Sequence, residues 1–262
     1  MPYNLAVARH GFEVVCELEP ATTPDLRHVR HQIRVLSAAC SAFLVPDNHI
    51  GRATVSSIAV AHEVTQMGGR AIACLNARDR NTLGFRRDLL TAAAYGVEEF
   101  LFVYGDRPES GRRSDDLSVR SMLEQARTFE HQGPGSQFRL GVAAALSPLP
   151  AWKREADFVF AQVGFSVGQL LRWRASVDFD GPVYAGVLVV ASAQMALKLT
   201  AEFPQLAVPD WLVERVERDR GAGVEAACEM VCQIRDSEVF DGVHLIPVHR
   251  YRDVARRLEA VL

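Results

Sequence analysis

Polar side chains stand at the ends of several apolar runs, and their types suit proton transfer and the binding of a heterocycle. A carboxylic acid can donate or accept a proton at a reacting atom. Carboxylates and amides can also bind the ring N–H and amino groups of a flat heteroaromatic ligand, against which an apolar wall can stack. The side chains that fit this description are Glu17, Asp47, Asn76, Asp106 and Gln162.

Most of these residues also have an ordinary structural interpretation. Asp106 lies in LFVYGDRPESG, where Gly, Asp and Pro together are typical of a turn. Asp47 with Asn48 favours turn chemistry as well. Gln162 could equally be an amide that is hydrogen-bonded within the fold.

Glu17 makes a stronger case for function. Alternation along VVCELEP places Cys16 and Leu18 on one side of a strand and Glu17 on the other. A carboxylate that points into a protein interior costs free energy unless it has a partner or a chemical role. We therefore expect Glu17 to take part in catalysis.

The elements that must position these residues follow a regular rhythm of short apolar, β-rich runs and helical patterns. The strands are expected at residues 12–18, 41–47, 70–77, 99–105, 138–146, 156–165, 181–190 and 242–248. The helices are expected at residues 24–39, 54–67, 81–95, 115–131, 166–176, 192–203, 209–219, 222–236 and 251–262, with Thr23 as the N-cap of the first. Residues 147–155 are short for a crossover helix.

This rhythm predicts an α/β fold, a single (β/α)8 TIM barrel that forms one domain over residues 1–262. The strands are continuously apolar, as strands covered on both faces should be. An open doubly wound sheet is the alternative. In a barrel the C-terminal ends of all strands converge on one mouth, which would gather the polar side chains named above.

Composition favours a soluble protein that binds a small molecule. Of the 262 residues, 48% are hydrophobic and 23% are charged, so the chain can bury a sizeable core. The net charge of −3 attracts neither nucleic acid nor an anionic membrane. No apolar run reaches the roughly 18–20 residues that span a bilayer, and the N-terminus lacks the pattern of a signal peptide. We expect a cytoplasmic protein.

Two weaker patterns point to structure more than to a site. Cys228 and Cys232 could share one helix face, but buried free thiols are favoured over a metal pair, and no metal is expected. The segment GAGVEA (221–226) resembles a phosphate-binding loop but does not follow a strand. A turn between two helices is favoured there.

Five segments resemble motifs of the methylenetetrahydrofolate reductase family. CELEP is similar to the family's E-x-x-P, YGDRP to its R-G-D-x-P, and ADFVFAQVGF to its A-x-x-x-x-T-Q-x-x-F. VYAGVLVV, with VPDW after it, is similar to I-P-G-I-x-P-V and I-P-x-W, and DGVHLIPVHR to G-x-H-F-Y-T-x-N. The order and spacing agree from about Phe12 to Arg250.

The resemblance implies a reaction and roles for three residues. The family reduces 5,10-methylenetetrahydrofolate to 5-methyltetrahydrofolate on a (β/α)8 barrel, usually with FAD and NAD(P)H. Glu17 matches the general acid, which protonates N10 so that the methylene bridge opens to an iminium at N5. Asp106 matches the aspartate that binds the amino-pyrimidine edge of the pterin, and Gln162 matches a glutamine that contacts folate. Asn76 and Asp47 are further substrate-binding candidates.

The sequence departs from the family on the flavin side. Tyr104 stands where the family has an arginine, Cys74 replaces a histidine and Asn76 a threonine, Ala145 replaces a tyrosine, and Ala193 replaces a covering phenylalanine. Only Lys153 and Arg154 remain near the expected flavin phosphates, so bound FAD is doubtful.

Direct hydride transfer from NADH or NADPH would fit these departures, as in flavin-independent members of mycobacterial type. Tyr104, Gly105, Ala145 and Lys153 would then border the cofactor position. The sequence leaves open a folate-binding barrel without reductase activity, an enzyme acting on another one-carbon folate adduct, and the choice between a monomer and a small homo-oligomer.

Overall fold

The computed structural model describes residues 11–132, 137–203 and 206–260, and strands and helices alternate through them. The strands are β1 (Glu13–Glu17), β2 (Ala42–Val45), β3 (Ala71–Asn76), β4 (Glu99–Val103), β5 (Arg139–Ala144), β6 (Phe158–Val163), β7 (Val183–Leu188) and β8 (Gly242–Ile246). The α-helices are α1 (Arg27–Leu36), α2 (Ser57–Gln66), α3 (Thr82–Tyr95), α4 (Val119–Gln132), α5 (Val167–Ala175), α6 (Ala193–Glu202), α7 (Asp210–Arg218), α8 (Ala222–Asp236) and α9 (Tyr251–Leu258). Two short 3₁₀ segments are η1 (His49–Gly51) and η2 (Ala151–Glu155).

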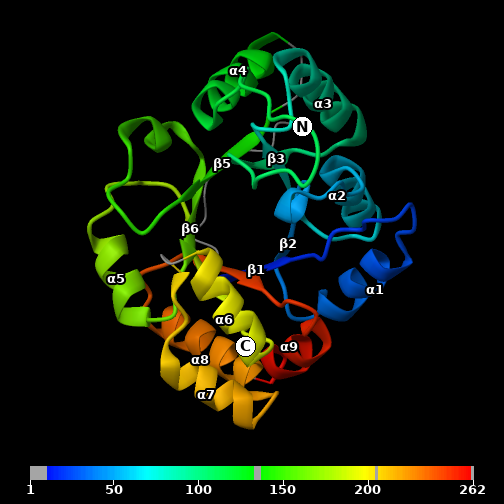
Figure 1. Ribbon diagram of the computed structural model, residues 1–262. Coiled ribbons are helices and arrows are strands. Elements are labelled where there is room, and N and C mark those ends of the chain that lie inside the picture. Colours follow the sequence, from blue (N-terminus) through cyan, green and yellow to red (C-terminus); the bar gives the residue numbers. More distant parts are fainter. Residues whose placement is uncertain (1–10, 133–136, 204–205, 261–262) are drawn as a thin grey trace.

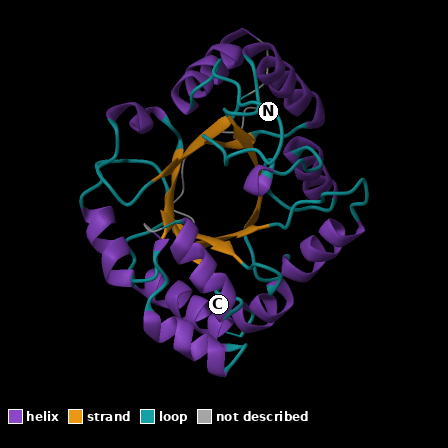
Figure 2. Ribbon diagram, in the orientation of Figure 1, coloured by secondary structure: helices purple, strands orange, loops and turns teal. Residues whose placement is uncertain are grey.

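The eight strands close into a parallel barrel in sequence order. Figure 2 shows the ring of strands with helices outside it. β1 pairs with β2 on one side and with β8 on the other, so the sheet has no free edge. The helices α1 and α9, from opposite ends of the chain, accordingly pack together (Figure 1). The predicted (β/α)8 barrel is confirmed, and the open sheet is excluded.

Alternation along the strands separates two apolar layers. Outward side chains such as Val14 and Cys16 are buried under the helices. The inward side chains form their own cluster: Val15, Ala42, Leu44, Ile72, Cys74, Leu101, Phe158, Phe160 and Tyr184. Glu17 follows Val15 by two positions and therefore faces the barrel interior, at its C-terminal end.

The opposite end of the barrel interior is closed by an ionic network. Arg70 contacts Glu13 at 2.8 Å and Glu99 at 3.5 Å, and Arg139 contacts Glu99 at 2.9 Å. The Tyr184 hydroxyl donates to Glu13 at 2.5 Å. Burial, together with this hydrogen bond, raises the pKa of Tyr184 to about 12.

Three helices begin three or four residues later than predicted, among them the helix expected at 54–67, which begins at Ser57. The first helix begins at Arg27, so Thr23 is not its N-cap; Asp25 instead accepts the backbone N–H of Arg27 at 2.9 Å and holds a turn there. The helix expected from residue 115 begins at Val119. Ser118 caps this helix by accepting the N–H of Ser121 at 3.1 Å.

Two connections shape the mouth. The β5–β6 link carries only η2, in agreement with the short segment expected at 147–155. After β7 the chain forms α6, α7 and α8 before β8. The GAGVEA segment is the turn from α7 into α8, where an added Cβ at Gly223 would lie 1.9 Å from the Val190 carbonyl oxygen. Gly223 therefore allows α8 to pack closely against Val190, just beyond β7.

Candidate active site

The interior face of the barrel mouth holds a carboxylate and an imidazole in contact. The Glu17 Oε2 atom, on β1, lies 3.2 Å from the His244 Nε2 atom on β8. Their side chains are only 15% and 12% exposed. The His244 ring also lies beside Phe160, with ring centroids 5.1 Å apart. A proton held between these two groups can be passed to a ligand in the mouth.

His244 was not among the candidate site residues that the sequence suggested. It lies in GVHLI, where alternation places one polar residue among apolar neighbours on the interior face. That pattern, combined with the closure of β8 onto β1, is the signal that could have identified it.

Gln162 lies on β6, two strands from β8 in the closed barrel. It is exposed, and its amide oxygen accepts the N–H of its neighbour Val163 at 3.3 Å. The pairing of β6 with β7 is irregular between Phe160 and Val163, which is where Gln162 lies. Ala143, on β5, is exposed as well. The side of the mouth formed by β5 and β6 is therefore open to a ligand.

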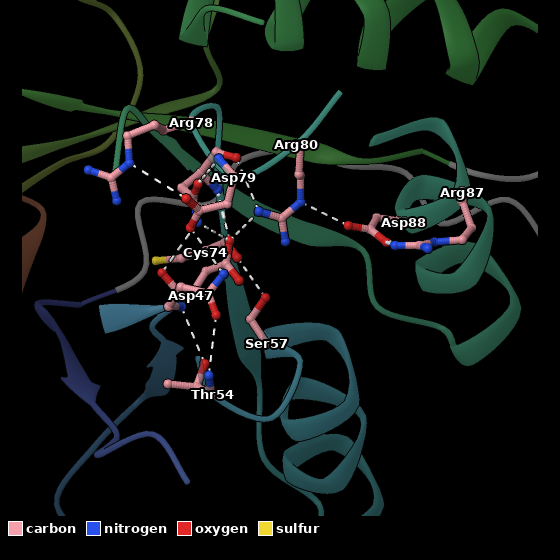
Figure 3. Close-up of polar contacts among 11 residues, drawn as sticks. Asp47, Thr54, Ser57, Cys74, Arg78, Asp79, Arg80, Arg87 and Asp88 are labelled. Atoms are coloured by element: carbon pink, nitrogen blue, oxygen red, sulfur yellow. Dashed lines mark hydrogen bonds and ion pairs between the residues drawn. The ribbon is translucent and has the colours of Figure 1, made fainter. Parts of the chain in front are cut away.

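Asp47 belongs to a buried hydrogen-bond cluster beside the mouth (Figure 3), and Asn76 is one of its partners. Asp47 Oδ2 accepts the backbone N–H of Asn76 at 3.0 Å and its side-chain amide at 2.7 Å. The Asp47 side chain is only 4% exposed and also pairs with Arg80. Asn76 in turn accepts the backbone N–H of Asp79 at 2.9 Å. Both residues thus have partners within the fold and support the loop after β3.

Arg80 joins this cluster to α3. Its guanidinium contacts Asp88 at 2.8 Å as well as Asp47. Burial alone would lower the pKa of Arg80, but the two carboxylates outweigh burial and raise it, so the charge is retained. Arg80 is thus a buried structural cation, not a solvated residue of the helix face.

Asp106 lies on the exposed loop after β4 and contacts the loop after β2. One of its carboxylate oxygens accepts the backbone N–H of Ile50 at 3.0 Å. Gly51 and Glu109 strengthen the same link, through a backbone hydrogen bond of 3.0 Å. Gly105 before Asp106 has φ +94, and an added Cβ would lie 2.9 Å from the Asn76 Cβ. The turn role of Asp106 is therefore present, and among the described residues no hydrogen bond to its other carboxylate oxygen is found.

Tyr104, Ala145 and Lys153 are residues that the sequence analysis assigned to the cofactor. Tyr104 is 53% exposed and its hydroxyl bonds Arg113 at 3.0 Å. Ala145 is exposed just beyond β5. Lys153 Nζ donates to the Ala143 carbonyl oxygen at 2.6 Å, and burial lowers the pKa of this ammonium group. Arg154, the other remaining cation, pairs with Asp178 at 2.8 Å.

The mouth thus brings together part of the expected set. Glu17 and Gln162 line the interior, joined by His244, while Asp106 stands on a loop above. Asp47 and Asn76 are enclosed beside the mouth. Within the ranges that the structure describes, no group of three or more His, Cys, Asp or Glu side chains could hold a metal ion. No helix in the same ranges is long and apolar enough to cross a membrane.

Comparison with known families identifies one relationship. The family model for methylenetetrahydrofolate reductase matches residues 152–260. This stretch contains Lys153, Gln162 and His244, and the N-terminal part with Glu17 and Asp106 lies outside it. The resemblance noted in the sequence is confirmed over the matched residues. No curated protein matches the chain significantly in sequence.

Solved structures share the barrel. An uncharacterized protein from Clostridium thermocellum, which binds two copies of 5-methyl-5,6,7,8-tetrahydrofolic acid, aligns with a TM-score of 0.65 and 10% identity over 97% of each chain. The spore cortex-lytic enzyme SleL of Bacillus cereus aligns with a TM-score of 0.55 and 12% identity over 96% of this chain and 74% of its own. A β-1,3-glucanosyltransferase of Rhizomucor miehei reaches a TM-score of 0.53 at 11% identity, over 89% and 85%. At such identities the likeness establishes the fold, and the chemistry must be argued from the site.

Proposed function

From the match of residues 152–260 to the methylenetetrahydrofolate reductase family, we propose that this protein reduces 5,10-methylenetetrahydrofolate to 5-methyltetrahydrofolate, with NADH or NADPH as hydride donor. The observation that carries the proposal is the Glu17–His244 pair inside the barrel mouth, at 3.2 Å. Binding alone would not need an acid held there, because a neutral hydrogen-bonding group would suffice.

The pair suits the first chemical step. Glu17 donates its proton to N10 of the bound folate, and the bond between N10 and the methylene carbon breaks. The N5 lone pair forms a double bond to that carbon, which becomes an electrophilic iminium. Hydride from the nicotinamide then completes the N5 methyl group. His244 holds the Glu17 carboxyl in place and can return a proton to it between turnovers.

Substrate contacts follow from the positions of Asp106 and Gln162. The other carboxylate oxygen of Asp106 is an acceptor for the amino and N–H groups of the pterin, and the exposed Gln162 amide supplies a contact from β6.

We also propose that FAD is not a resident cofactor. A flavin dinucleotide carries a diphosphate that needs cations or N–H donors. Lys153 is bonded to a backbone carbonyl, and Arg154 is paired with Asp178. With Tyr104 and Ala145 at the other expected contacts, the residues present fit the diphosphate poorly. The nicotinamide of NADH or NADPH would instead lie against the exposed Ala143 and Ala145.

The test is NADH and NADPH oxidation by purified, flavin-free protein, with and without 5,10-methylenetetrahydrofolate, followed by addition of FAD. Folate-dependent oxidation without flavin, with 5-methyltetrahydrofolate as product, is expected. Activity that appears only with FAD would contradict the flavin-independent part of the proposal. Another product would indicate a different one-carbon folate adduct as the substrate.

A second candidate is a folate-binding barrel without reductase activity. The Clostridium thermocellum protein, similar over almost its whole length, binds 5-methyltetrahydrofolic acid, the product of the proposed reaction. Titration with 5-methyltetrahydrofolate separates the candidates when run beside the oxidation assay. Binding without any nicotinamide oxidation would favour this second function.

A further inference from the structure

Two thiols, Cys16 on β1 and Cys40 just before β2, meet on the outer side of β1, away from the mouth. The sulfur atoms of Cys16 and Cys40 are 2.6 Å apart. This separation is much closer to a disulfide bond, of about 2.05 Å, than an ordinary packing contact would be. Cys16 is fully buried and Cys40 is half-buried. Neither residue takes part in the proposed reduction.

Hydrogen bonds between Ser41 and Val14 hold the segment that carries Cys40 against β1. Ser41 donates its N–H to the Val14 carbonyl oxygen at 2.8 Å, and Val14 donates its N–H to the Ser41 hydroxyl at 3.2 Å. These two bonds hold the residue after Cys40 against β1 just before β2 begins. The two sulfur atoms therefore meet on a backbone that is held in place by hydrogen bonds.

We propose that Cys16 and Cys40 form a reversible disulfide when the protein meets a peroxide. The Cys40 sulfur attacks the peroxide, takes one oxygen and becomes a sulfenic acid, while one water leaves. The Cys16 sulfur then attacks the Cys40 sulfur, and the second water leaves with the Cys16 proton. Two thiols and one hydrogen peroxide thus give one disulfide and two waters, and a dithiol reverses the reaction.

The order of the two steps follows from access. Cys40 borders an open surface hollow, of about 390 Å³, with Phe12, Ala38 and Ser41. Cys16 is enclosed, and its contact with Cys40, together with burial, raises the pKa of the Cys16 thiol well above its usual range. An oxidant in solution therefore meets Cys40 first, and Cys16 acts as the resolving thiol.

Other thiols provide the controls. Cys74 is buried on the interior face of the barrel, and Cys228 is buried on α8. Cys232 is half-buried like Cys40, but no other sulfur lies within hydrogen-bond distance of it among the described residues. Cys232→Ser is therefore the matched control for Cys40→Ser.

The experiment treats the reduced native protein with hydrogen peroxide, blocks the remaining thiols by alkylation and digests with trypsin. Cleavage after arginine places Cys16 in peptide 10–27, Cys40 in peptide 35–52, and Cys228 with Cys232 in peptide 221–235. The expected product is peptide 10–27 linked to peptide 35–52, with a mass lower by two hydrogen atoms and reversed by a dithiol. The bond should raise Tm by on the order of 5–10 °C.

Cys40→Ser should lose both the linked peptide and the rise in Tm, and Cys232→Ser should keep both. Cys40 oxidised to a sulfinic acid while Cys16 stays alkylated would overturn the proposal. A link from peptide 10–27 to peptide 221–235, or no loss of free thiol, would overturn it as well. The peptide map of the unsubstituted protein decides the matter even if the Cys40 variant fails to fold.

Discussion

At the scale of single residues, the proposed chemistry depends on a carboxyl group that is kept from water and paired. Glu17 and His244 are 227 positions apart in the sequence and meet only because β8 closes onto β1. The pair is nearly enclosed by apolar side chains, including Phe160. An acid in such a setting is positioned before the substrate arrives, which lowers the cost of proton transfer.

Glu17→Gln should abolish folate-dependent NADH oxidation while folate still binds, because glutamine keeps the shape and hydrogen-bonding capacity but holds no transferable proton. We expect kcat to fall by about 10²–10⁴-fold, with Kd for 5-methyltetrahydrofolate nearly unchanged. Glu19→Gln is the control, since Glu19 contacts His28 and the backbone of His249 outside the barrel interior. Turnover retained in the Glu17 variant would remove this residue from the acid role.

His244→Asn should show whether His244 positions Glu17 or contacts the folate substrate. Asparagine removes the second proton-holding group beside Glu17 and leaves the mouth wall otherwise similar. We expect kcat to fall by about tenfold to a hundredfold with little change in KM for the folate. A loss confined to KM would instead make His244 a substrate contact.

At the scale of elements, the loops after β2, β3 and β4 form one connected rim. Asp106 binds the backbone of Ile50, and Asp47 binds Asn76 and Arg80. The sequence indicated polar residues at these strand ends but not their bonding partners, because a turn residue and a ligand-binding residue have the same local pattern. Only the three-dimensional register decides that Asp47 is enclosed and Asp106 is exposed.

Asp106 carries two roles that substitution can separate. Asparagine can still accept the N–H of Ile50 through its amide oxygen, whereas alanine cannot. If the carboxylate binds the pterin, both Asp106→Asn and Asp106→Ala should weaken folate binding by about tenfold or more. Isothermal titration measures this directly. Normal affinity in the Asn variant would leave Asp106 with its turn role alone.

Gly105 sets the direction of that loop. With φ +94 and Asn76 packed against it, Gly105→Ala meets both backbone strain and a steric clash. Gly111→Ala is the matched control, because Gly111 has φ +85 but nothing within 4 Å of an added Cβ. Urea unfolding should give a loss of about 1 kcal/mol for Gly111→Ala and a larger loss, of about 2–4 kcal/mol, for Gly105→Ala. Equal losses would mean that the Asn76 contact relaxes freely.

At the scale of the whole molecule, the barrel follows from local patterns, and the side-chain contacts between its strands do not. Apolar runs of strand length, separated by helical periods, specify eight βα units, and these are the units observed. The network of Glu13, Arg70, Glu99 and Arg139 could not be predicted, because it joins charged residues near the starts of separate strands. The helix starts at Arg27 and Val119 differed from the prediction because Asp25 and Ser118 accept backbone N–H groups at those two helix starts.

The same network makes the stability of the barrel depend on pH in the alkaline range, through Tyr184. Its pKa is about 12 in the folded protein, against about 10 for an unfolded tyrosine. Because the folded pKa is raised, the stabilisation is fully present below about pH 10 and is lost as the pH rises through the folded value. Ionised Tyr184 would face Glu13 without a proton to donate.

Tyr184→Phe should therefore make unfolding less dependent on pH. Between about pH 9 and 12, the free energy of unfolding should fall by about 2 kcal/mol more in the unsubstituted protein than in the variant. Urea titrations across this range measure the difference, and ultraviolet absorbance of tyrosinate follows the ionisation itself. The absorbance of a tyrosine that ionises near pH 12 should be present in the unsubstituted protein and absent in Tyr184→Phe. Parallel pH profiles for the two proteins would show that the Tyr184–Glu13 hydrogen bond does not link proton binding to folding.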